Sequence, residues 1–191
     1  ADPAISRQEF LDYKFDLAFS DKSQMADARR AIMARDFSDD PVLKQAQDHI
    51  AAWDLKTDME NRHAAIGVYS MFGAIEAEVK GTPEPDPVEG FIWAANYLHE
   101  KFGTFDIAWG DLNRLRRGDK NVPVNGGPDI LRAIYDIDGP EDDGGLAAFV
   151  GDSFILLSEW YPDGRQDVFT VHQFGVAATR PDDPHYADQV D

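Results

Sequence analysis

The sequence predicts an α+β fold, with helices in its first half and antiparallel strands in its second. Apolar residues recur at helical spacing from residue 6 to residue 103. After residue 104 turn-forming residues become frequent, and two β-prone stretches flank a tight turn near the C-terminal end. We therefore expect a mainly helical region over 1–103 and a turn-rich region with antiparallel strands over 104–191.

Three helices are predicted before residue 56. Ser6 and Glu9 have the spacing of a capping box at the start of the first helix. The second helix lies within 23–36 and places Met25, Ala28 and Ile32 on one face. Asp40 can cap the third helix, and Pro41 suits its first turn. The apolar face of this third helix consists of Val42, Leu43, Ala46, Ile50 and Trp53.

Two further helices complete the first half. Residues 57–79 are apolar nearly all round and rich in Ala and Gly, which predicts one closely packed buried helix. The stretch GTPEPDP at 81–87 is a breaker. The next helix begins at Asp86 and Pro87 and can end at Gly103. Its predicted apolar face consists of Val88, Phe91, Ile92, Ala95, Leu98 and Phe102.

The second half shows a strand–turn–strand pattern. Residues 122–131 and 138–145 are turn-rich. Residues 146–160 predict one strand and residues 165–175 another, joined by YPDG with Asp163-Gly164 as a hairpin turn.

Composition excludes several classes of function. The chain holds 36 Asp and Glu against 18 Lys and Arg, for a formal net charge of −18, so we expect no nucleic-acid partner. No apolar run approaches the roughly 18–20 residues of a spanning helix, so no membrane partner is expected either. The absence of cysteine excludes disulfides, thiol catalysis and thiolate metal sites, and suits an oxidising compartment.

Three arginines, Arg114, Arg116 and Arg117, fall within four positions of WGDLNRLRRGD at 109–119. They could bind a carboxylate or phosphate through bidentate forks. Because carboxylates are so abundant here, we favour pairing with the chain's own acids, such as Asp111 and Asp119, which would pin a loop. We expect at least one arginine to be mostly buried, with two or more hydrogen bonds to a carboxylate or to backbone carbonyls. The residues of this predicted structural clamp are Arg114, Arg116, Arg117, Asp111 and Asn125.

Two loops could bind ions. The amides of Asn125-Gly126-Gly127 could form an anion nest, but the spacing of a phosphate loop is missing, so a turn with positive φ is favoured. The stretch YDIDGPEDDGG offers oxygens that could hold calcium, without the EF-hand order of ligands, so a solvated loop is favoured and no metal site is predicted. The acidic residues of that stretch are Asp136, Asp138, Glu141, Asp142 and Asp143.

No catalytic constellation emerges from the residues alone. The histidines are not expected to cluster, and no H-E-x-x-H motif is present. Ser153 lies in GDSFI, which lacks the G-x-S-x-G elbow. We therefore predict no catalytic residue, and the substrate-binding residues stay unknown. The five histidines are His49, His63, His99, His172 and His185.

Six stretches, taken in order, resemble one enzyme family. They are RQEFLDYKFDLAFSDKS, AAWDLKTDMENRHAA, WGDLNRLRRG, PVNGGPDILRA, GDSFILLSEW and HQFGVAATRPDDPHYADQ. The most specific motifs are W-G-x-x-N-R-L-x-R-G, Asn-Gly-Gly-Pro, Gly-Asp-Ser and Pro-His-Tyr-x-Asp-Gln, all in the second half. Together they resemble the penicillin-acylase-like amidases, which include penicillin acylases and acyl-homoserine-lactone acylases.

The resemblance implies part of an N-terminal-nucleophile hydrolase with a four-layer αββα core. In that family a precursor cuts itself into a small and a large chain, and the new N-terminal serine attacks an amide carbonyl. Its own α-amine, with a pKa of about 7.7–8.0, serves as the base. The implied partners are the rest of the large chain, the small chain and a small-molecule amide of the β-lactam or N-acyl-homoserine-lactone type. The implied location is periplasmic or secreted.

The sequence departs from this family at the nucleophile. Residue 1 is Ala1, which has no nucleophilic side chain, and no Gly-Ser cleavage junction is visible. The chain opens without an initiator methionine or a signal peptide, so we expect a processed or excised piece that resembles the C-terminal part of the large chain. The family's nucleophile, oxyanion-stabilising asparagine and calcium ligands would lie upstream, so no cofactor is expected here and the piece should be inactive alone. The alternative is a stand-alone, non-catalytic domain that binds a ligand or partner through its acidic face.

Overall fold

The computed structural model describes residues 4–175 and 179–187, so Ala1 and the last four residues lie outside the described part. It mixes helices with small sheets. The helices are α1 (Arg7–Lys14), α2 (Gln24–Met33), α3 (Pro41–Ala51), α4 (Ala64–Ser70), α5 (Phe72–Lys80), α6 (Pro87–Phe102) and α7 (Trp109–Leu112). The strands are β1 (Asn113–Arg117), β2 (Lys120–Pro123), β3 (Ile134–Tyr135), β4 (Leu146–Ala147), β5 (Val150–Gly151), β6 (Ile155–Trp160) and β7 (Gln166–Val171).

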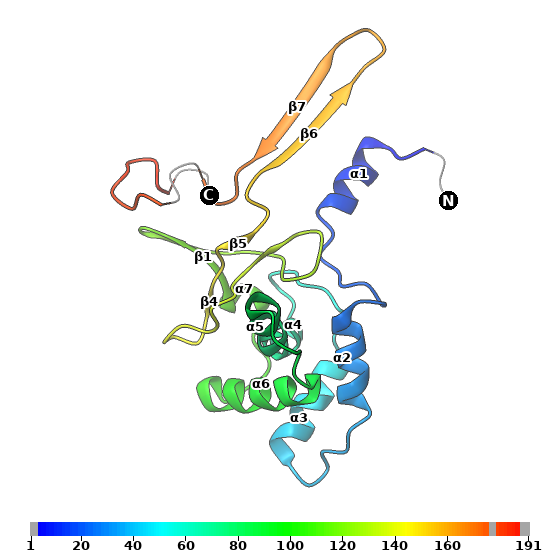
Figure 1. Ribbon diagram of the computed structural model, residues 1–191, viewed down its shortest axis with the longest axis vertical. Coiled ribbons are helices and arrows are strands. Elements are labelled where there is room, and N and C mark those ends of the chain that lie inside the picture. The colour runs from blue at the N-terminus through cyan, green and yellow to red at the C-terminus, as the bar shows by residue number, and fades with distance from the viewer. Residues whose placement is uncertain (1–3, 176–178, 188–191) are drawn as a thin grey trace.

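Figure 1 shows three parts of the molecule. Helices α2 to α6 form a body, and the short strands lie beside it. The β6–β7 hairpin projects away from this body, with α1 on one side of it. Among the residues described, no helix combines the length and the apolar character that crossing a membrane requires.

The predicted helix starts are confirmed by their caps. Ser6 Oγ accepts a hydrogen bond from the Glu9 amide at 3.2 Å, and Glu9 Oε2 accepts one from the Ser6 amide at 2.8 Å. Asp40 Oδ1 accepts from the first amides of α3, and Asp86 Oδ1 accepts from an amide of α6. At its other end α6 stops at Gly103, whose φ of 69° is left-handed. These polar side chains satisfy terminal amides that the helices cannot satisfy themselves.

The single helix predicted over 57–79 is wrong. Residues 57–63 form a loop, and the helical part is divided at Met71 into α4 and α5. Ser70 lies at the break, and its hydroxyl donates a hydrogen bond to the Ile66 carbonyl at 2.6 Å. Such a bond from a serine side chain to the carbonyl four residues earlier often bends a helix. Every residue of α4 is buried, whereas α5 buries only Ile75 and Ala77. The apolar run therefore serves two helices with different exposure.

The core lies between α2, α3, α4 and α6 and continues into the strand region. Gly67 of α4 lies against the Trp53 ring, where a Cβ would overlap the indole. Leu146 of β4 belongs to the same buried cluster, so the helices and the first strands share one core. The largest fully buried side chains are Trp53, Trp109, Tyr69, Phe91, Met25, Ile32, Ile50, Ile66, Leu98, Ile134, Leu146 and Val68.

The sheets are small, and one is mixed rather than antiparallel. Strand β1 pairs antiparallel with β2, with Leu115 opposite Val122, and parallel with β4, with Asn113 opposite Leu146. Strands β3 and β5 form an antiparallel pair. The parallel contact corrects the expectation of purely antiparallel strands, and it arises because the chain between β2 and β4 crosses over before it returns to β1.

The strand predicted over 146–160 is divided into β4, β5 and β6, which join three different sheets. Gly151 marks the second break, with a φ of 125° that favours glycine. The predicted hairpin is confirmed, since β6 and β7 pair antiparallel and Gly164 lies in the turn with a φ of 85°.

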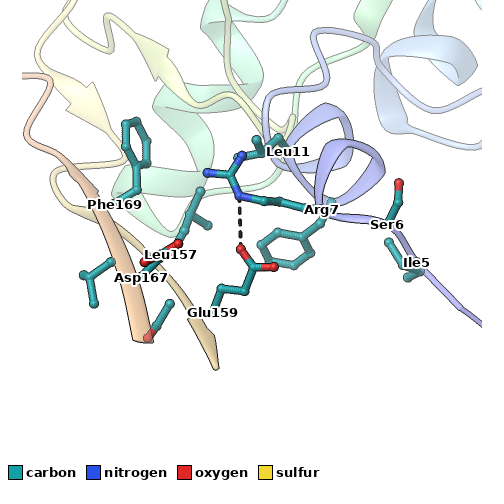
Figure 2. A pocket seen from close by; sticks show the side chains of 11 residues that line it. Ile5, Ser6, Arg7, Leu11, Leu157, Glu159, Asp167 and Phe169 are labelled. Atoms are coloured by element: carbon teal, nitrogen blue, oxygen red, sulfur yellow. Dashed lines mark ion pairs between the residues drawn. The ribbon is translucent and has the colours of Figure 1, made fainter. Parts of the chain in front are cut away.

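Helix α1 lies against one face of this hairpin, and a groove of about 520 Å³ remains between them (Figure 2). Arg7 Nε lies 3.2 Å from Glu159 Oε2, and Lys14 Nζ lies 2.7 Å from Asp152 Oδ2. No residue of α1 is buried. These ion pairs therefore hold α1 beside the hairpin, and a partly open groove with apolar walls separates the two. The apolar lining consists of Ile5, Phe10, Leu11, Leu157, Val168 and Phe169.

Candidate functional site

The three arginines were expected in a loop, but they lie on strand β1. Successive side chains of a strand point to opposite faces. Arg114 and Arg116 therefore share the more exposed face, while Arg117 lies on the buried face with Leu115. Strand geometry thus separates charges that the sequence places within four positions.

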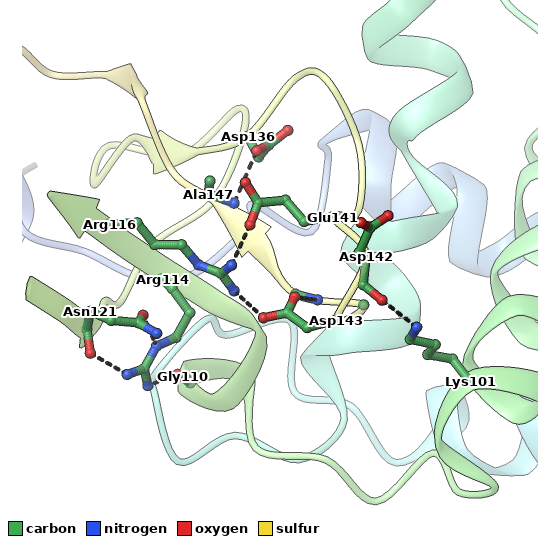
Figure 3. Close-up of polar contacts among 12 residues, drawn as sticks. Lys101, Gly110, Arg114, Arg116, Asn121, Asp136, Glu141, Asp142, Asp143 and Ala147 are labelled. Carbon is green, nitrogen blue, oxygen red and sulfur yellow. Dashed lines mark hydrogen bonds and ion pairs between the residues drawn. The ribbon is translucent and has the colours of Figure 1, made fainter. Parts of the chain in front are cut away.

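Arg114 joins three elements of the chain (Figure 3). Its Nε donates to Asn121 Oδ1 at 2.9 Å, and its Nη1 donates to the Gly110 carbonyl at 3.0 Å. Its Nη2 also donates to the Asn121 carbonyl. Two of the three bonds end on backbone carbonyls, so this guanidinium fixes α7 and β2 to β1.

Arg116 binds two carboxylates of the acidic loop that precedes β4. Its Nη2 lies 2.8 Å from Asp143 Oδ2, and its Nη1 pairs with Glu141 Oε2. The expected partners Asp111 and Asp119 are exposed, and no described contact joins either of them to Arg114 or Arg116. The prediction of these partners is therefore wrong for both arginines. The parallel pairing of β1 with β4 brings the more distant acids closer.

Arg117 is the buried arginine of the cluster, with 9% of its surface exposed. Its guanidinium carbon lies 4.9 Å from the centre of the Tyr186 ring. This cation–π contact joins β1 to the Pro-His-Tyr segment near the C-terminal end.

Two carboxylates of the acidic loop accept hydrogen bonds from backbone amides of the same loop and of β4. Asp136, 3% exposed, accepts from the amides of Asp138, Gly139 and Ala147 at 2.7, 2.8 and 3.0 Å. Burial raises the pKa of Asp136, although the three amides oppose that rise. Asp143 Oδ1 accepts from the Gly145 amide at 2.9 Å. That amide, and then the Arg116 guanidinium, hold the pKa of Asp143 below its ordinary value.

The calcium hypothesis finds no site in this loop. Within residues 4–175 and 179–187, no three His, Asp or Glu side chains are placed to hold a metal ion. Glu141 and Asp143 face Arg116 instead, and Asp136 faces three amides.

The Asn-Gly-Gly turn is an anchor point, and the favoured interpretation of a positive-φ turn is confirmed at Gly126, where φ is 102°. Asn125 Oδ1 accepts from the Met59 amide at 2.7 Å. The Gly126 amide donates to the Thr57 carbonyl at 3.1 Å, and the Gly127 amide donates to the Arg132 carbonyl at 3.4 Å. Since both glycine amides already have acceptors, the turn does not offer them to an anion.

A buried junction on the same turn was missed at the level of the sequence. The Gly126 carbonyl accepts from the Trp109 indole at 2.8 Å and lies 3.4 Å from Asn113 Nδ2. The same Asn113 nitrogen lies 3.3 and 3.2 Å from the carbonyls of Val124 and Ile134. Trp109 and Asn113 are both 0% exposed. A polar amide between Leu112 and Leu115 was the signal that could have identified this residue.

Two histidines lie together, contrary to the expectation that none would cluster. The ring centres of His49 and His63 are 4.3 Å apart, because the last turn of α3 faces the start of α4. His49 Nε2 lies 2.7 Å from the Arg62 carbonyl. Burial, and then the neighbouring His63, lower the pKa of His49, although the Arg62 carbonyl opposes the burial effect.

Among the residues that the structure describes, no serine hydroxyl is hydrogen-bonded to either ring of this histidine pair. Ser153 is exposed, and within the described residues it forms no hydrogen bond with a histidine. His172 packs on Phe154 at 4.6 Å between ring centres, and His99 lies 6.2 Å from Phe105. The described residues therefore contain no hydrogen-bonded serine–histidine pair.

Replacing Asn113 with Asp should strongly destabilise the fold. A carboxylate at this position would face three carbonyl oxygens without a donor, at a cost of about 3–5 kcal/mol in the free energy of unfolding. Asn113→Ala should cost about 1–3 kcal/mol, because carbonyls lose a donor. Asn96→Asp on the exposed side of α6 is the control. Urea denaturation measures all three, and equal effects of N113D and N96D would contradict the junction.

The predicted clamp can be tested with alanine at each arginine. We expect Arg114→Ala to lower the free energy of unfolding by about 1–2 kcal/mol, because two backbone carbonyls lose their hydrogen-bond donor. Arg116→Ala should cost about 1 kcal/mol, since its carboxylate partners are 46% and 59% exposed and solvent screens the pairs. If Arg114→Ala, Arg116→Ala and Arg117→Ala each lose less than about 1 kcal/mol in denaturation, the clamp hypothesis fails and anion binding returns as the alternative.

The carboxyl of Asp143 should titrate below the ordinary aspartate pKa of about 3.9. Because the folded pKa is depressed, its contacts stabilise the fold above that ordinary value, and the stabilisation is lost as pH falls through the folded pKa. Carboxyl ¹³C NMR measures this pKa directly. Arg116→Met should raise it only in part, since the Gly145 amide remains. A pKa at or above 3.9 in the unmodified chain would rule out the proposed contacts.

A scan against protein-family models and a search of curated proteins both find no match to this chain.

Proposed function

We propose that this chain is part of a penicillin-amidase-like hydrolase, which cleaves the amide bond between an acyl group and an amine. Its partners would be the rest of the large chain and the small chain of the same enzyme. The substrate would be a small-molecule amide of the β-lactam or N-acyl-homoserine-lactone type. A periplasmic or secreted location agrees with the absence of cysteine.

The observation that carries this proposal is the β6–β7 hairpin, which has apolar side chains on both faces. Leu157 and Phe169 face α1 across the groove in Figure 2. On the opposite face Leu156 and Trp160 are 53% and 72% exposed. Strands that are apolar on both faces are typical of sheets covered on both sides, as in a layered αββα arrangement.

The hairpin also has open edges. Strands β6 and β7 form a two-stranded sheet on their own within the described part of the chain. An isolated two-stranded hairpin is marginally stable in water, and exposed apolar edges favour pairing with another strand. The proposal assigns the missing strands and covering layer to the rest of the large chain.

The W-G-x-x-N-R-L-x-R-G stretch at 109–118 has a physical role under this proposal. Trp109 and Asn113 bind one carbonyl, and Arg114 and Arg116 fix neighbouring segments to β1. These contacts support a scaffolding function for this part of the enzyme. The nucleophile, its amine base and the oxyanion stabiliser would come from elsewhere in the parent protein.

The 191-residue chain alone should self-associate through the hairpin. A double variant, Trp160→Ser with Val168→Thr, should remove much of the exposed apolar area and lower the associated fraction in light scattering. Leu131→Ser is the matched control, because Leu131 is also exposed, at 58%, but lies outside the hairpin. A clean monomer before substitution, or an equal effect of the control, would contradict the open-edge interpretation.

Amidase activity separates this proposal from the non-catalytic alternative. Expression of the complete reading frame that encodes this segment should yield two chains, which mass spectrometry would detect. The larger chain should start with a nucleophilic residue. That product should hydrolyse a phenylacetyl amide or a long-chain acyl-homoserine lactone, while the 191-residue chain should not. Turnover by the short chain that survives repurification would overturn the scaffolding role. A complete reading frame that yields one uncleaved and inactive chain would favour the acidic binding domain.

A further inference from the structure

A second groove, of about 600 Å³, lies between α5, the start of α6 and the loop over 137–140. Its size falls within the range of small-molecule sites. Its walls are mainly apolar and include one large exposed aromatic side chain, Trp93. The apolar walls are formed by Phe72, Val79, Pro85, Trp93, Ile137 and Pro140.

The Trp93 indole is 43% exposed, and its neighbours hold it in place. It stacks on Tyr97 with ring centres 5.3 Å apart and an interplanar angle of 16°. Phe72 meets it edge-on at 6.2 Å. Tyr97 stacks in turn on Tyr69, whose hydroxyl donates to the Gly144 carbonyl at 2.7 Å. This row of packed rings presents the exposed indole as a π surface in the groove.

The charged groups that line the groove are mostly acidic. Glu76, Glu89 and Asp138 contribute carboxylates, and Lys80 contributes one ammonium group. Lys80 is already paired with Glu76. Within the described part of the chain, Glu89 and Asp138 form no ion pair, so two carboxylates without an ion-pair partner line the same groove as the indole. The chain as a whole, at −18, also repels anions.

We propose that this Trp93 groove binds a small organic cation of the quaternary ammonium type. An indole face attracts a cation whose charge is spread over methyl groups, and nearby carboxylates add to that attraction. The apolar walls receive the methyl groups, which a hydrated inorganic cation would not offer. The inference is independent of the proposed hydrolase, because the groove lies outside the stretches that resemble the amidases.

The test compares choline with its neutral isostere 3,3-dimethylbutan-1-ol on the 191-residue chain. Saturation-transfer NMR on the ligand methyl protons gives the dissociation constants. The chain has four tryptophans, and their indole N–H signals in a ¹⁵N–¹H spectrum identify which ring the ligand contacts. We expect choline to bind at least two- to fivefold more tightly than the isostere, as a cation–π contact at an exposed site predicts, and to shift the Trp93 signal. Added sodium chloride should weaken the binding.

Variants locate the site. Trp93→Leu should abolish choline binding, and Glu89→Gln or Asp138→Asn should each weaken it about twofold. Trp160→Leu is the matched control, because Trp160 is an exposed tryptophan on the distant hairpin and should be dispensable. The two carboxylate variants are surface changes, so they test the site even if Trp93→Leu fails to fold. Equal binding of the isostere, unchanged binding in Glu89→Gln and Asp138→Asn, or a shift confined to another indole would each overturn the proposal.

Discussion

The arrangement of this molecule depends on the carbonyl of Gly126. That oxygen accepts from the Trp109 indole, lies beside the Asn113 amide, and belongs to a turn whose own amide donates to Thr57. Trp109 belongs to the main core, and Asn113 begins the first strand. A buried carbonyl without partners would cost free energy, so the turn, the core and the strand must form together. The helical body and the strands are therefore one cooperative unit at this point rather than two layers in loose contact.

The position of β1 explains how the chain accommodates three neighbouring arginines. Its parallel contact with β4 brings the acidic loop beside Arg116, and its antiparallel contact with β2 brings Asn121 to Arg114. Arg117 lies on the other face, against Tyr186. Each guanidinium thus fixes a different segment, which makes the cluster a structural element. The hydrolase proposed for the chain would draw its chemistry from residues beyond those described.

Local signals in the sequence were sufficient for the helix ends and the hairpin turn. Ser6, Asp40 and Asp86 cap their helices as predicted, because capping depends on residues only two or three positions apart. The divisions of 57–79 and 146–160 were not predicted. They depend on which distant segment each piece packs against, and hydrophobic periodicity does not contain that information. Asn113 was missed for the same reason, since its three carbonyl neighbours come from two later segments.

Helix α1 has a consequence for the order in which the molecule folds. It has eight residues, none of them buried, and its contacts reach across to Asp152 and Glu159 at the other end of the sequence. So short a helix is not stable in isolation, and closing so large a loop is entropically costly until the partner surface exists. We therefore expect α1 to dock only after β6 and the segment around Asp152 have formed. Its capping box keeps a helical start available until that surface exists.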